Sequence, residues 1–276
     1  MTTAAEPYLD DDALPIVSES PQVIVGASGP LIGVATRVVS VADVAVLIVP
    51  APGGSRTGAH RLHVRLAREL ARRGIPSMRF DAADGGDSVA GAGSSAFHDD
   101  DVVAAARHLL TLQPDAFVAL LAAGDAAVSA ARSWNALIRA AVPLSALCLV
   151  DPVMAIPAPA RRQGWFRRIF GGTPPGAEEA GSPPPHGESA ETAATLRVWR
   201  GLPAAVRTGR SRLLVAARGD DRSNAALVGL ARGTRAWRRA LRRSDGWLQI
   251  GEADPGFGLS AHRRVLADWL AARLIA

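Results

Sequence analysis

Apolar residues in this chain come in short runs that alternate with longer stretches of helical spacing. Val44–Val49 is unbroken and largely β-branched, which is typical of a strand buried on both faces of a parallel sheet. Over Ala59–Arg73 the apolar positions recur at near-helical spacing, and Gly74 is suited to end the helix. Another strand is predicted at Ile75–Phe80. The pattern therefore predicts a strand, a helix and a second strand.

The same alternation continues along most of the chain, and a hairpin precedes it. The hairpin strands are Val23–Val25 and Leu31–Val39, with a turn at Gly26–Pro30. After Phe80 the pattern predicts helix Asp99–Leu112, strand Ala116–Leu121, helix Asp125–Arg139, strand Leu144–Val150, strand Arg212–Ala217, helix Asn224–Arg232, strand Trp247–Ile250 and helix Ser260–Leu274. Short connections between such elements predict a mostly parallel central sheet with flanking helices. Ligands of such sheets bind at the carboxyl ends of the strands.

A segment in the middle of the chain interrupts this alternation. Residues 155–210 carry a basic, aromatic-bearing stretch at Arg161–Phe170, a flexible loop rich in Pro, Gly and Ser over 171–187, and a further predicted helix over 190–208. We expect this insertion to form a short cap, or lid, over the strand ends. The predicted organisation is a disordered tail, the first part of the core, the cap and the second part of the core, at residues 1–20, 21–154, 155–210 and 211–276.

The composition narrows the classes of protein that fit. The chain has 276 residues, 48% of them hydrophobic and 21% charged, which is enough apolar material for a large core. Its single cysteine, Cys148, excludes a disulfide scaffold and a cysteine-based zinc site. No apolar run reaches the roughly 18 residues of a membrane span, and the start is acidic. We therefore expect no transmembrane helix, no signal peptide and a cytoplasmic location.

The charge raises a second possibility. All 31 basic residues are arginine, and the net charge is +5. Because arginine binds phosphates and carboxylates in a bidentate way, binding to nucleic acid or an anionic surface is a hypothesis, with the Arg-rich helix near Arg235–Arg243 as the contact. Aromatic residues make up only 5% of the chain and do not interleave with the basic stretches, so nucleic acid is not the favoured partner.

The order of elements, with a hairpin, a parallel sheet, an insertion and a final strand and helix, predicts an α/β-hydrolase fold. That fold places its nucleophile on a sharp turn between a strand and a helix, flanked by small residues. Here the turn falls at Leu121–Ala127, and its central residue, Gly124, has no side chain to attack a substrate. A shift of one residue makes Asp125 central. Asp125 is then either a nucleophile of the dehalogenase kind or, more simply, the cap of the next helix.

The acid and the base of a catalytic triad are expected after the last two strands. Asp220 follows the strand Arg212–Ala217 and serves either as the acid or as a turn residue. The loop after Trp247–Ile250 contains no histidine. His262 follows inside the terminal helix, where it is either a displaced base or a surface residue.

Two further histidines raise the question of a metal site. His60 and His63 stand three residues apart at the start of a predicted helix, a spacing that can place two ligands on one face. No third ligand is evident in the sequence. We therefore expect no metal and no other cofactor.

The glycine-rich loop after the first parallel strand lies in a distinctive stretch, Val46–Arg61. Its Gly-Gly-Ser and Gly-Ala-His-Arg resemble a glycine-rich loop and a following Gly-Ser-His-Arg in the exosortase A system-associated hydrolases, type 1, of the α/β-hydrolase superfamily. The resemblance continues through Leu66–Pro76, Arg79–Asp81, Gly86–Ser88, Asp125–Ala127, Asp151–Pro152, Trp165–Arg168 and Ala253–Asp254. It covers about residues 22–155 well and 210–272 weakly.

The resemblance implies a cytoplasmic hydrolase of acyl esters or thioesters, encoded with bacterial exopolysaccharide and protein-sorting machinery as its partners. The family's Cys or Ser nucleophile maps onto Gly124, its acid onto Asp220 and its histidine onto Pro255. Two of the three positions thus hold residues that cannot perform the triad's chemistry. The mapping leaves an oxyanion region of backbone N–H groups at Gly53, Gly54 and just after Gly124.

Three functional hypotheses follow. In the first, a hydrolase-fold protein with a degenerate triad binds a small ligand or acyl-type substrate and turns it over weakly or not at all. In the second, it is an active hydrolase with a displaced constellation of Asp125 or a nearby Ser, His262 and Asp220. The third is the Arg-rich binder of an anionic surface or of nucleic acid.

Overall fold

The structure, a computed structural model of the whole chain, describes residues 18–39, 42–88, 98–154, 190–219, 221–242, 246–254 and 256–275. These residues form one eight-stranded sheet in the order β1-β2-β4-β3-β5-β6-β7-β8. The strands are β1 (Ser18–Gly26), β2 (Gly29–Arg37), β3 (Val44–Ile48), β4 (Ser77–Phe80), β5 (Phe117–Ala123), β6 (Leu144–Val150), β7 (Arg212–Arg218) and β8 (Trp247–Ile250). β2 pairs antiparallel with β1 and β4, and the other pairs are parallel.

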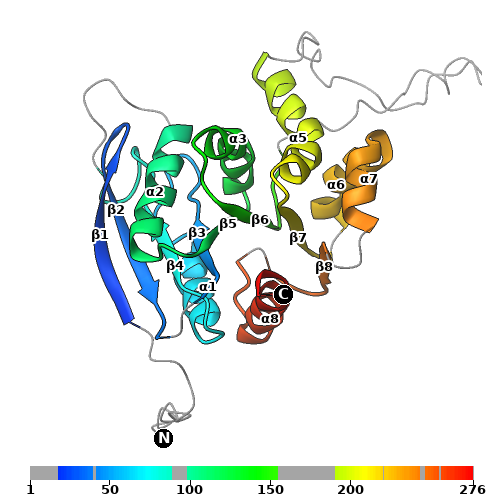
Figure 1. Cartoon of the computed structure of the whole chain (residues 1–276). Helices are drawn as coiled ribbons and strands as arrows, with labels where there is room; N and C mark the ends of the chain where they lie inside the picture. Colours follow the sequence, from blue (N-terminus) through cyan, green and yellow to red (C-terminus); the bar gives the residue numbers. More distant parts are fainter. Residues whose placement is uncertain are drawn as a thin grey trace, which may run out of the picture.

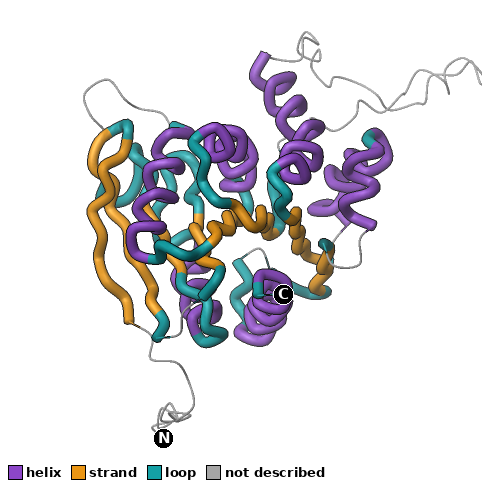
Figure 2. Tube along the Cα trace, viewed as in Figure 1, coloured by secondary structure: helices purple, strands orange, loops and turns teal. Residues whose placement is uncertain are grey.

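Helices cover both faces of the sheet (Figure 1, Figure 2). On one face lie α1 (Leu62–Ala71), which follows a 3-10 turn at Ala59–Arg61, and α8 (Ser260–Leu274). On the other face lie α2 (Asp99–Leu112), α3 (Ala126–Arg139), α5 (Ala190–Thr208), α6 (Asp221–Gly233) and α7 (Arg235–Arg242). No described helix is long and apolar enough to span a membrane.

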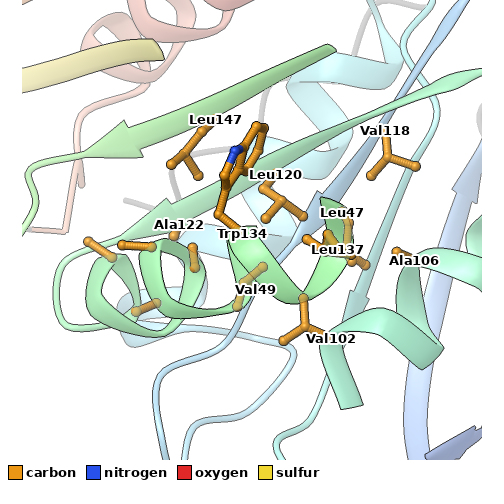
Figure 3. Close-up of a cluster of buried hydrophobic side chains, with 14 of the residues drawn as sticks. Leu47, Val49, Val102, Ala106, Val118, Leu120, Ala122, Trp134, Leu137 and Leu147 are labelled. Carbon is orange, nitrogen blue, oxygen red and sulfur yellow. The ribbon is translucent and has the colours of Figure 1, made fainter. Parts of the chain in front are cut away.

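The central strands face a hydrophobic core on each side. Successive side chains of β5 alternate between the two cores, with Val118 and Leu120 in one and Ala119 and Leu121 in the other. Figure 3 shows the fully buried indole of Trp134, from α3, beside Leu120. Burial on both faces explains why these strands are continuous apolar runs in the sequence.

The hairpin at the edge of the sheet is tied to the helix that covers it. Gly26 pairs with Gly29 across a two-residue turn, and the buried Ser28 lies in that turn. Ser28 donates its N–H to Asp101 Oδ1 at 3.0 Å and its O–H to Asp101 Oδ2 at 2.7 Å. Asp101 belongs to the first turn of α2, where the helix dipole also favours a carboxylate. The turn is therefore held by a buried carboxylate.

Most of the predicted helices and strands are confirmed, with shifted ends. β5 runs to Ala123, beyond the predicted end at Leu121. The predicted tail over residues 1–20 is too long, because Ser18–Ser20 pair with Ala35–Arg37 in the hairpin. Residues 1–17 lie outside the described part of the chain.

The expected cap over residues 155–210 is described only from Ala190 onward. That part is α5, whose Trp199 and Val206 are buried in the core. Trp199 Nε1 donates to the carbonyl of Met154 at 3.0 Å, and Trp237 Nε1 of α7 donates to the carbonyl of Trp199 at 2.6 Å. Residues 190–208 are therefore a core helix and not a cap, because their apolar face is needed to cover the sheet.

Asp101→Ala removes the acceptor for two buried donors of Ser28. We expect the free energy of unfolding to fall by about 1–3 kcal/mol, the cost of leaving buried polar groups unpaired. Asp100→Ala is the control, because it removes an exposed carboxylate from the same helical turn. Denaturant titration of both variants measures the difference. Equal stabilities would show that Asp101 does not hold the hairpin.

Candidate functional site

The turn between β5 and α3 has the geometry that the fold uses for a nucleophile. Gly124 adopts a left-handed backbone conformation, with φ of +57°. Its N–H donates to the Val150 carbonyl at 2.9 Å, and its own carbonyl accepts from Val153 N at 3.1 Å and from Ala127 N at 3.2 Å. The turn is therefore anchored to the end of the neighbouring strand β6 and to the first turn of α3.

The position at the apex of this turn is open. A Cβ built on Gly124 meets no described residue within 4 Å, so the described part of the chain leaves space there for a side chain. A left-handed φ is strained for most residues other than glycine, and such strain is typical of a nucleophile turn. The structure therefore keeps the place and the backbone conformation of a nucleophile, while the residue itself supplies no reactive atom.

Asp125 follows directly and stands at the position before α3. Its backbone is helical, with φ of −65°, and its side chain makes no capping hydrogen bond. The prediction that Asp125 caps the helix is therefore wrong, because the side chain of a capping residue must fold back onto the N–H groups of the first turn. The carboxylate is exposed, and the Asp125 N–H has no hydrogen-bond partner among the described residues.

The glycine-rich loop after β3, residues 50–58, is joined to the loop after β4, residues 81–88. Gly53 donates its N–H to Asp84 Oδ1 at 2.9 Å. Gly54 donates its N–H to the Ala51 carbonyl at 2.8 Å. The two expected oxyanion donors thus already have acceptors within the chain, and a ligand must displace Asp84 to reach Gly53.

A buried carboxylate fixes this pair of loops. Asp81 ends β4 with its side chain fully buried, and it accepts from Asp87 N at 2.8 Å. The Arg56 guanidinium pairs with Asp81 and also donates to Asp87 Oδ2 at 2.6 Å. These contacts, first the hydrogen bond to Asp87, raise the pKa of Arg56 despite partial burial. Gly86 is required here, because an added Cβ would lie 2.3 Å from the Asp81 carboxyl carbon.

The loop after β8 is held by its own carboxylate. Asp254 accepts hydrogen bonds from Gly256 N at 3.1 Å and from Gly258 N at 2.7 Å. Slight burial opposes ionisation, but the N–H groups of Gly258 and Gly256 and the nearby His262 lower the pKa of Asp254. The Asp254 carboxylate is therefore engaged in shaping the loop.

The three predicted catalytic residues are not brought together in the described residues. Asp220 lies outside the described part of the chain, as does Pro255. His262 stands in the first turn of α8, and its Nδ1 is buried without a hydrogen-bond partner among the described residues. No described hydrogen bond or ion pair joins His262 to Asp125.

The sequence analysis missed the contact between His60 and the loop after β8. A Cβ built on Gly256 would lie 2.7 Å from His60 Cδ2, so the imidazole packs directly against this loop. His60 and Arg61 both adopt left-handed backbone conformations, with φ of 50° and 60°. In the sequence, His60 belongs to the resemblance and to a possible metal pair with His63, and neither gives any sign of a contact nearly two hundred residues away.

His63 packs beneath the glycine-rich loop. No group of three or more potential ligands is found among the described residues. The imidazole of His63 is buried against Gly58, where an added Cβ would lie 2.6 Å from the ring. Burial lowers the pKa of His63 to about 4, although a hydrogen bond to the Ser55 backbone opposes the shift. His63 is therefore a neutral packing residue beneath the glycine-rich loop.

This burial predicts a pH-dependent stability. The unfolded chain binds a proton at the ordinary pKa of 6.5, whereas the folded imidazole does so only near pH 4. The free energy of unfolding should therefore fall as the pH is lowered from about 6.5 to 4, by up to about 3 kcal/mol from this group. His63→Gln should flatten that slope, whereas Val64→Ala should lower stability and keep the slope. Denaturant titrations across this pH range decide, and identical slopes in wild type and His63→Gln would refute the assignment.

The comparisons with known proteins concern the fold. No protein-family model matches the chain, and no curated protein does. A putative α/β hydrolase of unknown function from Agrobacterium tumefaciens superposes with a TM-score of 0.55 at 15% identity, over 92% of this chain and 96% of that one. An α/β serine hydrolase without lid from Xanthomonas campestris superposes with a TM-score of 0.54 at 18% identity, over 95% of this chain and 98% of that one. The dienelactone hydrolase from Anabaena variabilis superposes with a TM-score of 0.54 at 12% identity, over 93% of this chain and 96% of that one.

At such low identities the similarity establishes the architecture and leaves the reaction open. The strand order, the antiparallel β2 and the helices on both faces agree with it. The chain therefore has the α/β-hydrolase fold that the order of its elements predicts, with a glycine at the turn where that fold places a nucleophile.

Proposed function

We propose that this protein binds a small acyl-type ligand at the carboxyl end of its sheet and does not turn it over by a serine or cysteine mechanism. The observation that carries the proposal is Gly124, which keeps the left-handed geometry of the nucleophile turn without a reactive side chain. Loss of a nucleophile lowers the rate of such enzymes by several orders of magnitude. Binding can survive that loss because it uses other groups.

No other described thiol or hydroxyl stands at the turn in place of the missing nucleophile. Cys148 is fully buried in β6, and burial raises its pKa to about 12, so it is neither accessible nor ionised. The first side chains of α3 are the apolar Ala126 and Ala127, both buried. The exposed carboxylate of Asp125 is the only nucleophilic group that the described turn presents.

The groups at this edge favour a neutral carbonyl over a carboxylate. The Asp125 N–H has no acceptor among the described residues. The Gly53 N–H can donate to a ligand once Asp84, its present acceptor, is displaced. Both donors belong to residues on the loops where the fold binds an oxyanion. The carboxylates of Asp84, Asp125 and Asp254 stand on the same edge and repel a ligand of like charge. An ester or thioester carbonyl accepts hydrogen bonds from such donors and carries no negative charge, so it fits this site.

The resemblance to the type 1 exosortase A system-associated hydrolases supports a more specific setting. It rests on Val46–Arg61 and on the Arg79–Asp81 and Gly86–Ser88 segments. All three segments meet in the structure, because Arg56, Asp81 and Asp87, one residue from each, form one ion-pair cluster. From the resemblance we propose a cytoplasmic protein that acts beside bacterial exopolysaccharide machinery.

A second candidate function is an active hydrolase with a displaced constellation of Asp125, His262 and Asp220. Two observations favour it: the Asp125 carboxylate does not cap its helix, and His262 Nδ1 is without a partner among the described residues. An Asp nucleophile would displace halide from a haloalkane. Halide release by wild type that disappears in Asp125→Asn would establish this candidate, and release by neither protein would remove it.

The main proposal predicts that the purified protein is inert toward probes of serine and cysteine hydrolases. Fluorophosphonate and iodoacetamide should label no single residue, and turnover of p-nitrophenyl acetate and butyrate should not exceed that of a Gly53→Asp/Gly124→Val double variant. Intact mass, peptide mapping and absorbance measure these outcomes. Stoichiometric labelling at one residue, with saturable turnover above the double variant, would contradict the proposal.

Gly124→Cys tests whether the turn is open. The side chain fits because no described residue lies within 4 Å of an added Cβ, although the positive φ costs roughly 1–2 kcal/mol in stability. Iodoacetamide should alkylate residue 124 of the folded variant, while Cys148 stays protected. Ala126→Cys, at a buried position two residues later, is the control and should react far more slowly. Equal rates for the two variants would show that the turn is not accessible.

A further inference from the structure

The amino end of the sheet, opposite the nucleophile turn, contains a cavity of about 570 Å³. It lies where β7 and β8 begin, among α5, α7 and α8. A volume of this size is in the range of small-molecule sites. The described residues of the loops that follow the strands do not line it, so the described lining is separate from the site described above.

Four guanidinium groups line this cavity, from Arg207 of α5, Arg212 of β7, Arg239 of α7 and Arg273 of α8. No acidic residue occurs among the described lining residues. Arg207, Arg212 and Arg239 take part in no ion pair within the described part of the chain. Positive charge from four separate elements is therefore concentrated at this cavity.

The negative ends of two helix dipoles compensate only part of this positive charge. Arg207 and Arg273 stand in the last turns of α5 and α8, where cations are favourable, and Arg212 Nη1 donates to the Arg273 carbonyl at 2.5 Å. Each helix end is equivalent to about half a negative charge, so the two together offset roughly one of the four positive charges. Arg207, Arg212 and Arg239, which have no ion pair in the described part of the chain, therefore leave an excess of about two positive charges among the described lining residues.

Apart from Ser211 and Gly246, the rest of the described lining is apolar. Its side chains come from one face of α5, one face of α7 and the start of β7, namely Pro203, Val206, Leu213, Leu214, Ala236 and Ala240. Arginine binds phosphate in a bidentate way, and several arginines together suit a dianion better than a monoanion. We propose that this cavity binds a phosphate monoester whose organic group is apolar. The phosphate is held by the arginines, and the organic group packs against the apolar wall.

The charge at the two ends of the sheet supports the assignment. The loops at the carboxyl end expose Asp84, Asp125 and Asp254. The cavity at the amino end presents only arginines as charged groups among its described lining. A dianion is therefore attracted to the amino end and repelled from the carboxyl end.

Decyl phosphate, used below its micellar concentration, is the probe. Titration calorimetry at low salt should show saturable binding at one site per chain, weakened severalfold by 0.5 M salt because screening reduces the attraction. An Arg207→Gln/Arg239→Gln double variant should bind at least tenfold more weakly. Arg200→Gln/Arg235→Gln is the matched control, since it removes two exposed arginines from the same two helices outside the cavity and should bind within twofold of wild type.

Three further ligands test the chemistry. Decanol lacks the charge and inorganic phosphate lacks the apolar group, so each should bind at least tenfold more weakly than decyl phosphate. Decanoate carries a single charge and should bind severalfold more weakly. Equal affinity for decanoate would overturn the choice of a dianion. No binding of decyl phosphate, or unchanged binding in the Arg207→Gln/Arg239→Gln variant with an unaltered melting temperature, would overturn the site itself.

The phosphate can belong to a soluble compound or to a lipid headgroup, and a sedimentation experiment distinguishes these sources. Cosedimentation with phosphatidate vesicles that the Arg207→Gln/Arg239→Gln variant loses identifies a lipid. Binding to monomeric decyl phosphate without cosedimentation identifies a soluble ligand. Both results support the same recognition of phosphate.

Discussion

Burial of the central strands on both faces is the constraint on which the rest of this structure depends. β3, β5 and β6 are covered by α1 and α8 on one side and by α2, α3 and α5 on the other, so their side chains are apolar almost without exception. Burying polar groups in such a core is costly, and the polar groups therefore lie at the two ends of the strands, the carboxyl end and the amino end of the sheet. The nucleophile turn and the phosphate-ester cavity lie at opposite edges for this reason.

At the carboxyl ends of the strands, the turn at Gly124 has the backbone conformation of a nucleophile turn and carries no reactive side chain. The left-handed turn at Gly124 is held by backbone hydrogen bonds to Val150 and Val153. The Gly53 N–H donates to the Asp84 carboxylate. These contacts are mostly to backbone, so they persist when the side chain at the apex is removed. The left-handed conformation, which is strained for a nucleophile, costs glycine almost nothing. Glycine therefore allows this turn at little conformational cost.

The two edges also differ in how their charges are balanced. At the carboxyl ends of the strands, the partly exposed Arg56 pairs with the buried Asp81 and with Asp87, and Asp254 accepts backbone donors of its own loop. At the amino edge, the arginines compensate helix dipoles and still leave an excess. Balanced charges hold loops together, whereas unbalanced charges attract a ligand from solution. This difference is the physical basis for assigning a structural role to the first group and a binding role to the second.

The sequence alone determined the order and kind of the elements and the absence of a reactive side chain at Gly124. The reason is that apolar periodicity and turn residues are local properties, and strands buried on both faces leave an unbroken signal such as Val44–Val49. Asp125 was misassigned as a cap, since only its side-chain direction could show otherwise. The contact of His60 with the loop after β8 and the convergence of Arg207 and Arg239 were decided by the tertiary structure alone. Such contacts join residues from separate elements, and no spacing along the chain encodes the distance between them.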